Sequence, residues 1–203
     1  MAVLLEDESR NRDLAGLEEL LSVWIDEIGP GGWYEVDPAV DAMLRNRFRS
    51  LWEKGARGAL ARYITSPRKA LAVIILLDQL PRNMFRGSPM AFSTDNLARK
   101  YAKIAIHRGY DMRIPEPERQ FFYLPLMHSE CISDQERSVR LFKERMPATG
   151  EKNLPHARAH REIIRRYGRF PTRNAALKRQ DTPAESEFLE KGGYGSVLRE
   201  LSA

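Results

Sequence analysis

The chain has 203 residues, of which 42% are hydrophobic and 30% are charged, and its net charge is +5. This length and composition predict a single folded domain over residues 1–203 with a sizeable core. The longest apolar run, residues 70–77, is far shorter than the roughly 18 residues of a membrane span, and residues 1–13 hold too short an apolar patch for a secretory signal. Because Cys131 is the only cysteine, no internal disulfide can form, and the sequence predicts a cytoplasmic protein without membrane contact.

Apolar residues that recur at spacings of three and four predict about eight helices. We expect residues 1–13 to be frayed and residues 59–64 to add one short turn. The expected helices, in chain order, cover residues 14–28, 38–54, 68–80, 95–107, 115–130, 134–145, 154–167 and 183–191. The expected N-terminal caps are Asp37, the segment Ser93-Thr94-Asp95, Ser133, Asn153 and Thr182, and Gly168 is an expected stop.

The helix over 68–80 is expected to be the enclosed, central one, because its residues 70–77 are apolar on every side. Three β-branched residues in this run also permit a strand, but the chain has no second run of this kind with which a strand could pair. The predicted fold class is therefore all-α, with stacked antiparallel helix pairs in a tetratricopeptide-like superhelical array. Residues 98–111 resemble the first helix of such a repeat, although no second copy is convincing.

Asp78 stands at the end of the apolar helix, so its carboxylate is expected to be buried and to need a partner. Arg82 lies four residues later and can supply a bidentate contact, with Asn83 beside it. These residues form either an ion pair that fixes the end of the helix or one wall of a polar pocket.

His128 lies on the same helical stripe as Phe121 and Leu124, so we expect its ring to point inward. Arg119 precedes it and Glu130 follows it, and either could set its orientation or its charge. His128 is either a hydrogen-bonded core residue or a catalytic acid and base.

His156 and His160 are four residues apart and share one helix face, which is compatible with metal ligation. The HxxxH order does not match the HExxH motif, and no carboxylate lies nearby on that face, so we expect no metal. His160 also lies on the apolar stripe and is expected to face the core. The sequence contains no P-loop, GxGxxG, GxSxG or CxxC motif, so no cofactor is expected either.

Residues 151–180 contain nine Lys or Arg residues and two acidic residues. A solvated helix face with some anchoring arginines is favoured over a nucleic-acid surface, because no nucleic-acid-binding signature accompanies the charge. Arg169 and Arg173 follow the stop at Gly168 and either clamp an anion or cap helix ends. Cys131 is expected to be a partly buried, unreactive thiol.

Six motifs occur in order along the chain: LLDQLPRNMFRG, AFSTDNLA, ERQFFYLPLMHSE, QERSVRLF, HARAHREIIRRYGRFPTRNA and TPAESEFL. In these motifs the chain resembles a bacterial family catalogued as a domain of unknown function (number 924), over roughly residues 17–189. The resemblance implies an all-α, tetratricopeptide-like arrangement and carries no established activity. The family's motif positions correspond here to Asp78, Gln79, Pro81, Arg82, Asn83, Glu118, Arg119, His128, Ser129, Glu130, His160, Gly168, Arg169, Phe170, Arg173 and Asn174.

Three functional hypotheses follow from the sequence. The favoured one is a helical binding module for a peptide, a protein or a small anionic ligand, while nucleic acid is a less favoured partner and the oligomeric state stays open. The expected ligand-binding residues are Arg82, Asn83, Arg119, His160, Arg169 and Arg173. The alternative is a small hydrolase or transferase acting on an anionic metabolite, with His128 as general acid and base and Asp78 or Glu130 orienting it. The third is a purely structural use of the inward polar groups.

Overall fold

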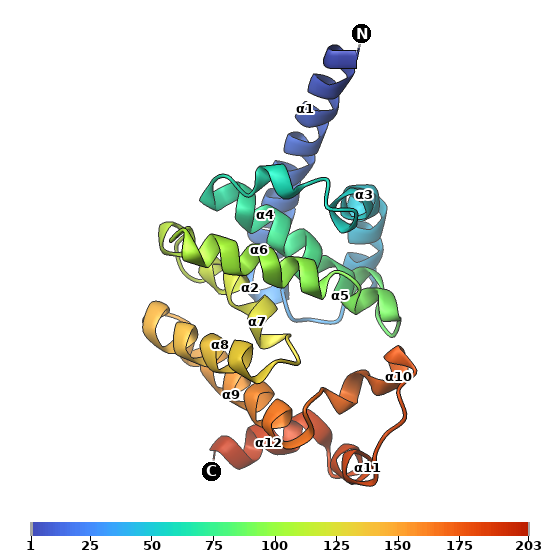
Figure 1. Ribbon diagram of the computed structural model, residues 1–203, viewed down its shortest axis with the longest axis vertical. Coiled ribbons are helices and arrows are strands. Elements are labelled where there is room, and N and C mark those ends of the chain that lie inside the picture. The colour runs from blue at the N-terminus through green and yellow to red at the C-terminus, as the bar shows by residue number, and fades with distance from the viewer. Residues whose placement is uncertain (1, 203) are drawn as a thin grey trace. The chain divides into compact units, whose positions relative to one another are not determined.

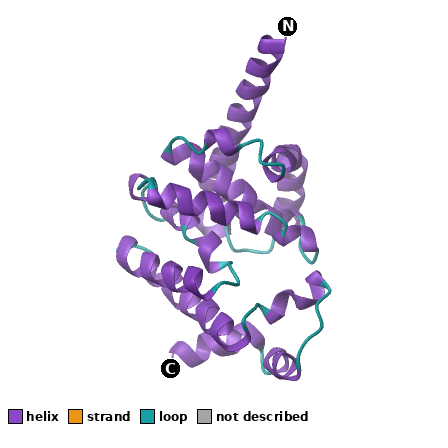
Figure 2. Cartoon of the chain, in the orientation of Figure 1, coloured by secondary structure: helices purple, strands orange, loops and turns teal. Residues whose placement is uncertain are grey.

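The computed structural model describes residues 2–202, and the side chains of residues 7–201. Over this range the chain forms helices and no strands, so the predicted all-α class is confirmed (Figure 2). The chain divides into two compact units: the first runs to Arg86 and resumes over Met90–Ile114, and the second consists of Gly87–Pro89 and the chain from Pro115 onward. This division describes how compactly each part of the chain is packed. That residues 1–203 fold together as a single domain stays a prediction.

The helices of the first unit pack around one buried helix, α4 (Figure 1). In chain order they are α1 (Ala2–Leu21), the π-helical turn η1 (Ser22–Ile28), α2 (Gly29–Gly32), α3 (Pro38–Ala56), η2 (Ala61–Tyr63), α4 (Pro67–Asp78), α5 (Leu80–Met84), α6 (Asp95–His107) and η4 (Asp111–Arg113). The short turn η3 (Pro89–Phe92) begins where the chain passes from the second unit back to the first.

The sequence-based prediction of an enclosed central helix is confirmed by α4. Every residue from Ala70 to Asp78 is buried, and α1, α3 and α6 all pack against this helix. α4 ends at Asp78 and α5 starts at Leu80, so the break falls just before Pro81, which cannot donate a backbone hydrogen bond within a helix.

The first helix begins earlier than expected, at Ala2 instead of residue 14. Asp13 is 2% exposed and pairs with Lys54 at 2.6 Å, and the hydroxyl of Tyr63 donates to the carbonyl of Arg10. These contacts hold part of the segment that we expected to be frayed. Met1 lies outside the described residues.

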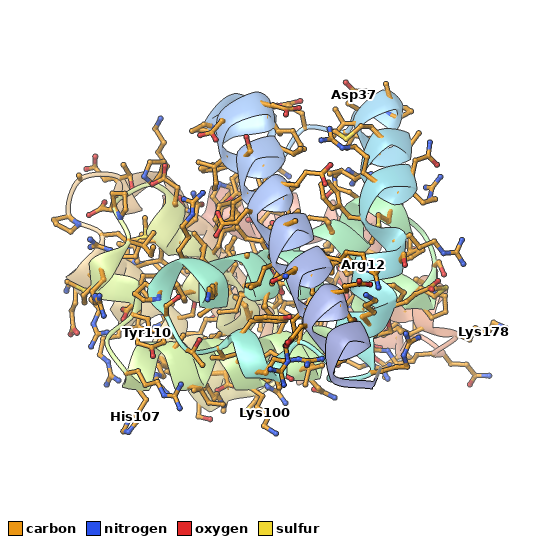
Figure 3. All side chains as sticks on the ribbon, turned by 90° about the horizontal axis from the view of Figure 1, so that it is seen from above. Arg12, Asp37, Lys100, His107, Tyr110 and Lys178 are labelled. Carbon is orange, nitrogen blue, oxygen red and sulfur yellow. The ribbon has the colours of Figure 1, made fainter. Side chains whose placement is uncertain are left out.

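Two of the predicted caps are confirmed by their hydrogen bonds. The carboxylate of Asp37 accepts from the amides of Ala39 and Val40 at 2.7 and 3.3 Å, at the first turn of α3 (Figure 3). Thr182 and Glu185 form a capping box at the start of α11.

Thr94 is the N-cap residue of α6, as the sequence predicted, but its hydroxyl makes no cap bond and donates to the carbonyl of Leu77 at 2.6 Å. The caps predicted at Ser133 and Asn153 are wrong. α8 begins at Ile132, one residue before Ser133, and α9 begins at Gly150. Asn153 therefore lies inside α9, where its side-chain amide donates to Gln120 at 2.7 Å.

The second unit contains a helical hairpin of α8 and α9, on which the C-terminal helix α12 packs (Figure 1). Its elements are η5 (Glu118–Phe122), α7 (Leu124–Met127), α8 (Ile132–Arg145), α9 (Gly150–Tyr167), η6 (Pro171–Arg173), α10 (Asn174–Leu177), α11 (Pro183–Glu190) and α12 (Gly193–Ser202). A core of apolar side chains joins α9 to the elements after it: Ala159, Ile163, Ile164, Phe170, Phe188 and Val197.

Two features of the second unit differ from the prediction. The expected helix over 115–130 is split into η5 and α7 at Tyr123, just before Pro125, which has no backbone N–H to donate and stands in the first turn of α7. α12 was not predicted, because the last expected helix was the one over residues 183–191. No described helix of either unit has the length and apolar character needed to cross a membrane.

Candidate functional site

In the first unit, Asp78 and Arg82 form the ion pair that their spacing suggested. Asp78 is 1% exposed, and a guanidinium nitrogen of Arg82 lies 3.6 Å from its carboxylate. Arg82 also donates to both oxygens of Asp95 on α6, at 2.9 and 3.1 Å. Burial alone would lower the pKa of Arg82, but the charges of Asp78 and Asp95 raise it. Arg82 thus stays charged and ties the end of α4 to the start of α6.

Asn83 belongs to a different network of the first unit. Its amide donates to Asp41 of α3 at 3.0 Å, and the same carboxylate receives two bonds from Arg86, at 2.6 and 3.1 Å. This geometry supports a structural interpretation of Asn83.

In the second unit, Glu130 is held by an arginine that the sequence analysis did not single out. Arg179 donates to both oxygens of Glu130 at 2.9 and 3.0 Å, and the amide of Phe170 donates to it at 2.8 Å. Burial would raise the pKa of Glu130, but these bonds and the charges of Arg179 and Arg173 lower it. Glu130 therefore links the end of α7 to the loop after α9, and a role in orienting His128 stays a prediction.

Arg169 and Arg119 also make bonds within the second unit. Arg169 donates to both oxygens of Glu185 at 2.6 and 2.7 Å, and so connects the end of α9 to the capping box of α11. Arg119 donates to the carbonyl of Arg145 at the end of α8 and lies 3.6 Å from Glu116. Both arginines thus hold helix ends together.

The remaining predicted residues of the second unit, His128, His160 and Arg173, lie close to one another. The rings of His128 and His160 are 6.3 Å apart between centroids. Arg173 donates to the backbone carbonyl of His128 at 3.0 Å, and its guanidinium lies 4.5 Å from the ring centroid of Phe170. The ring of Phe170 in turn contacts His160 at 5.4 Å.

Tyr194 of α12 completes this group, and the sequence analysis missed it. Its ring lies edge-on to His160 at 5.1 Å, and its hydroxyl is hydrogen-bonded to Nδ1 of His156. We call His128, His160, Phe170, Arg173 and Tyr194 the histidine cluster. A signal for Tyr194 exists in the sequence, because apolar residues at 194, 197, 198 and 201 follow a helical spacing.

The hydrogen bonds of His160 define its protonation state. Its Nδ1 lies 2.8 Å from the backbone carbonyl of His156, and since a carbonyl only accepts, Nδ1 carries the hydrogen. Burial, followed by the positive charge of His128 and that of Arg173, lowers the pKa of His160 to about 3. Burial also lowers the pKa of His156 and raises that of Tyr194 to about 12. His160 is therefore neutral at physiological pH.

The basic segment after residue 150 is largely paired with carboxylates. Arg161 pairs with Glu136, Arg165 and Arg166 both bind Glu162, and Arg166 also binds Glu200. This arrangement agrees with the interpretation of the segment as a solvated helix face.

Two further predicted features concern metal binding and the thiol. Among the side chains that the structure describes, no three His, Cys, Asp or Glu residues are placed to hold a metal ion together. Cys131 is exposed, not partly buried as expected, because it precedes the first turn of α8. A hydrogen bond from the hydroxyl of Ser133 lowers the pKa of its thiol.

A family model described as "Bacterial protein of unknown function (DUF924)" matches residues 20–193. The chain belongs to this family. The chain is similar to a solved structure of a protein of unknown function, ATU0120 from Agrobacterium tumefaciens, with 40% sequence identity and a TM-score of 0.82. The match covers 88% of this chain and 99% of that chain. No curated protein matches the chain.

Membership of the DUF924 family supports the resemblance drawn from the six motifs and brings no activity with it. Four motif positions of the family lie together in the histidine cluster of this member: His128, His160, Phe170 and Arg173. The other predicted site residues of the second unit, Glu130, Arg119 and Arg169, hold loops and helix ends. The histidine cluster is therefore the candidate site.

Proposed function

We propose that this chain is a helical binding module whose second unit recognises a small anionic ligand at the histidine cluster. The observation that carries the proposal is the distribution of charge around Glu130. Two arginines, Arg173 and Arg179, lower the pKa of this one carboxyl, and Arg179 alone already binds both of its oxygens. Arg173 also donates to the backbone carbonyl of His128, so both arginines bring positive charge to the part of the second unit that holds the histidine cluster.

The lowered pKa of His160 also indicates that the surroundings of its ring are positively charged. After burial, the groups that lower its pKa are His128, Arg173 and His156, all of them basic. A site whose neighbours oppose a further positive charge attracts a negative one. Three arginines of α9, Arg161, Arg165 and Arg166, are paired with Glu136, Glu162 and Glu200. A narrow anion site is therefore favoured over an extended nucleic-acid surface.

In this proposal the helices serve as the scaffold, in the tetratricopeptide-like manner that the sequence predicted, and the protein acts in the cytoplasm. The anion is either a free metabolite or a charged group on a peptide or a protein. A small inorganic anion probes the shared chemistry of all three sources.

The test is a thermal-shift and calorimetric titration of the full chain with inorganic phosphate. A ligand that binds only the folded state stabilises it by about 2.7 kcal/mol at 100 times its Kd. We expect a rise in Tm for the wild-type chain and no rise for Arg173→Gln, which removes the charge beside His128.

The matched control is Arg165→Gln, which removes an equal charge from the exposed, Glu162-paired face of α9. Circular dichroism checks that each variant is folded. If Arg173→Gln is unfolded, His160→Asn takes its place. Equal shifts in wild type, Arg173→Gln and His160→Asn would refute the assignment of the ligand to this cluster.

A further inference from the structure

The C-terminal helix α12 is joined to the rest of the second unit through two consecutive glycines. Gly192 and Gly193, which connect α11 to α12, have φ angles of +98° and +52°. These angles lie in the left-handed region, which glycine adopts readily and other residues adopt only with strain. The backbone dihedral angles can therefore change at this joint while α11 and α12 both stay helical.

α12 lies against α9 and is held there by apolar packing, a hydrogen bond and an ion pair (Figure 1). Val197 is 1% exposed and belongs to the apolar core that α12 shares with α9. The hydroxyl of Tyr194 is hydrogen-bonded to Nδ1 of His156, and Glu200 pairs with Arg166 at 2.6 Å. Because Glu200 is exposed, this ion pair contributes little, and the packing around Val197 and Tyr194 holds the helix.

Tyr194 also covers His160, its ring lying edge-on to the imidazole at 5.1 Å between centroids. Nδ1 of His160 donates to the carbonyl of His156, so any further proton on this ring is added at Nε2. Among the side chains that the structure describes, no carboxylate forms an ion pair with His160. An imidazolium at this position would be covered by Tyr194 and would lack a counter-charge.

The charged groups that face His160 do not stabilise its protonated form. Three of them are basic: His156 on α9, His128 at the end of α7 and Arg173 in η6. From α12 the ring is faced by Tyr194, which burial keeps neutral by raising its pKa to about 12. The carboxylate of Glu130 is bound through both oxygens by Arg179. Proton uptake by His160 is therefore easier once water reaches the ring.

We propose that α12 is a latch that acid opens: the helix turns away from α9 at the Gly192–Gly193 joint, and His160, no longer covered by Tyr194, takes up a proton from solvent at Nε2. Opening also uncovers the apolar face of α9 that Val197 covers in the closed form. This inference goes beyond the proposed anion site and does not depend on it.

The direction of the pH effect follows from the two states of His160. In the closed form its pKa is about 3, and in water the ordinary value is 6.5. Between these values the open form holds one proton more than the closed form, so opening becomes more favourable as pH falls. For one proton, the equilibrium constant for opening rises about tenfold between pH 7.5 and 5.5.

The experiment is hydrogen exchange of the full chain, followed by mass spectrometry at about pH 7.5 and 5.5. Exchange rates are divided into the intrinsic rate at each pH, so that the resulting protection factors report only the opening of the structure. We expect the protection factors of the α12 amides to fall about tenfold at the lower pH. Those of α8, in the same unit, are expected to stay unchanged.

Three variants separate the proton from the joint. His160→Asn keeps a donor to the carbonyl of His156 and is expected to remove the pH dependence of α12. The matched control His107→Asn removes an exposed histidine of α6 and is expected to keep the full change. Gly192→Ala strains the closed joint, so α12 is expected to lose about tenfold in protection at both pH values. Circular dichroism checks folding, and His160→Gln replaces His160→Asn if the latter is unfolded.

Three results would overturn the latch. The first is equal protection of α12 at both pH values in the wild-type chain. The second is a fall that His160→Asn leaves unchanged, because another group then takes up the proton. The third is an equal fall in α8 and α12, because the whole second unit then opens. None of these results bears on anion binding, which the phosphate titration tests separately.

Discussion

The neutral His160 ring is expected to make the folded protein less stable as the solution is acidified. Its pKa in the folded chain is about 3, whereas the ordinary value is 6.5. Between these values the unfolded chain binds a proton that the folded chain does not, so stability falls as pH falls. At pH 5, which is 1.5 units below the ordinary value, this difference amounts to about 2 kcal/mol.

The perturbation that isolates this effect is His160→Asn. The Asn amide can replace Nδ1 as donor to the carbonyl of His156, but it does not titrate. Urea unfolding followed by circular dichroism, at intervals between about pH 7.5 and 5, gives the free energy of unfolding of both proteins. The wild type is expected to lose about 2 kcal/mol more than the variant over this interval.

The difference between the two plots of unfolding free energy against pH, for wild type and for His160→Asn, removes the contributions of the other titrating groups. Glu162 and Glu185 have pKa values lowered to about 2 by their arginine partners, so their stabilisation is lost as pH falls from 4.5 toward 2. That loss occurs equally in both proteins and cancels. Parallel curves for wild type and His160→Asn down to pH 5 would refute the claim that the fold holds this ring neutral.

Three further predictions concern packing and ion pairs. In Gly150→Ala the new Cβ would lie 2.6 Å from a backbone carbonyl oxygen of α8, so calorimetry should show stability lowered by about 1–3 kcal/mol. Arg82→Met removes the guanidinium that pairs with the buried carboxylate of Asp78 and with Asp95, and urea unfolding should show a loss of about 3–5 kcal/mol. Glu185→Gln weakens a capping box and a bidentate ion pair and should lower Tm more than Glu187→Gln, whose partner is an exposed lysine.

Local signals in the sequence predicted much of the fold. The caps at Asp37 and Thr182 and the enclosed helix over residues 70–78 depend on neighbours within a few positions, and the structure confirms all three. The split between η5 and α7 was missed, because the expected helix over residues 115–130 was continued through Pro125, which stands in the first turn of α7. α12 was missed, although its apolar residues at 194, 197, 198 and 201 follow a helical spacing.

The candidate site was only partly predictable, for a related reason. His128, His160 and Arg173 were named from their local patterns, and they do lie together. The partners of Glu130 and Arg169 are 49 and 16 residues away in the chain, so no local pattern could show that these charges are already paired. The sequence identified the charged residues, and the three-dimensional contacts decide which of them hold the fold.

The second folded unit extends beyond the segment that the family model matches, because it includes α12. The match ends at residue 193, where α12 begins, and yet Val197 is 1% exposed against α9 and Tyr194 contacts His160. A protein shortened to the matched segment would keep His128, His160 and Arg173 but would uncover the apolar face of α9. A ligand screen carried out on the matched segment alone would therefore use a chain that lacks Tyr194 beside His160. In that chain His160 is more exposed to solvent, and burial lowers its pKa less.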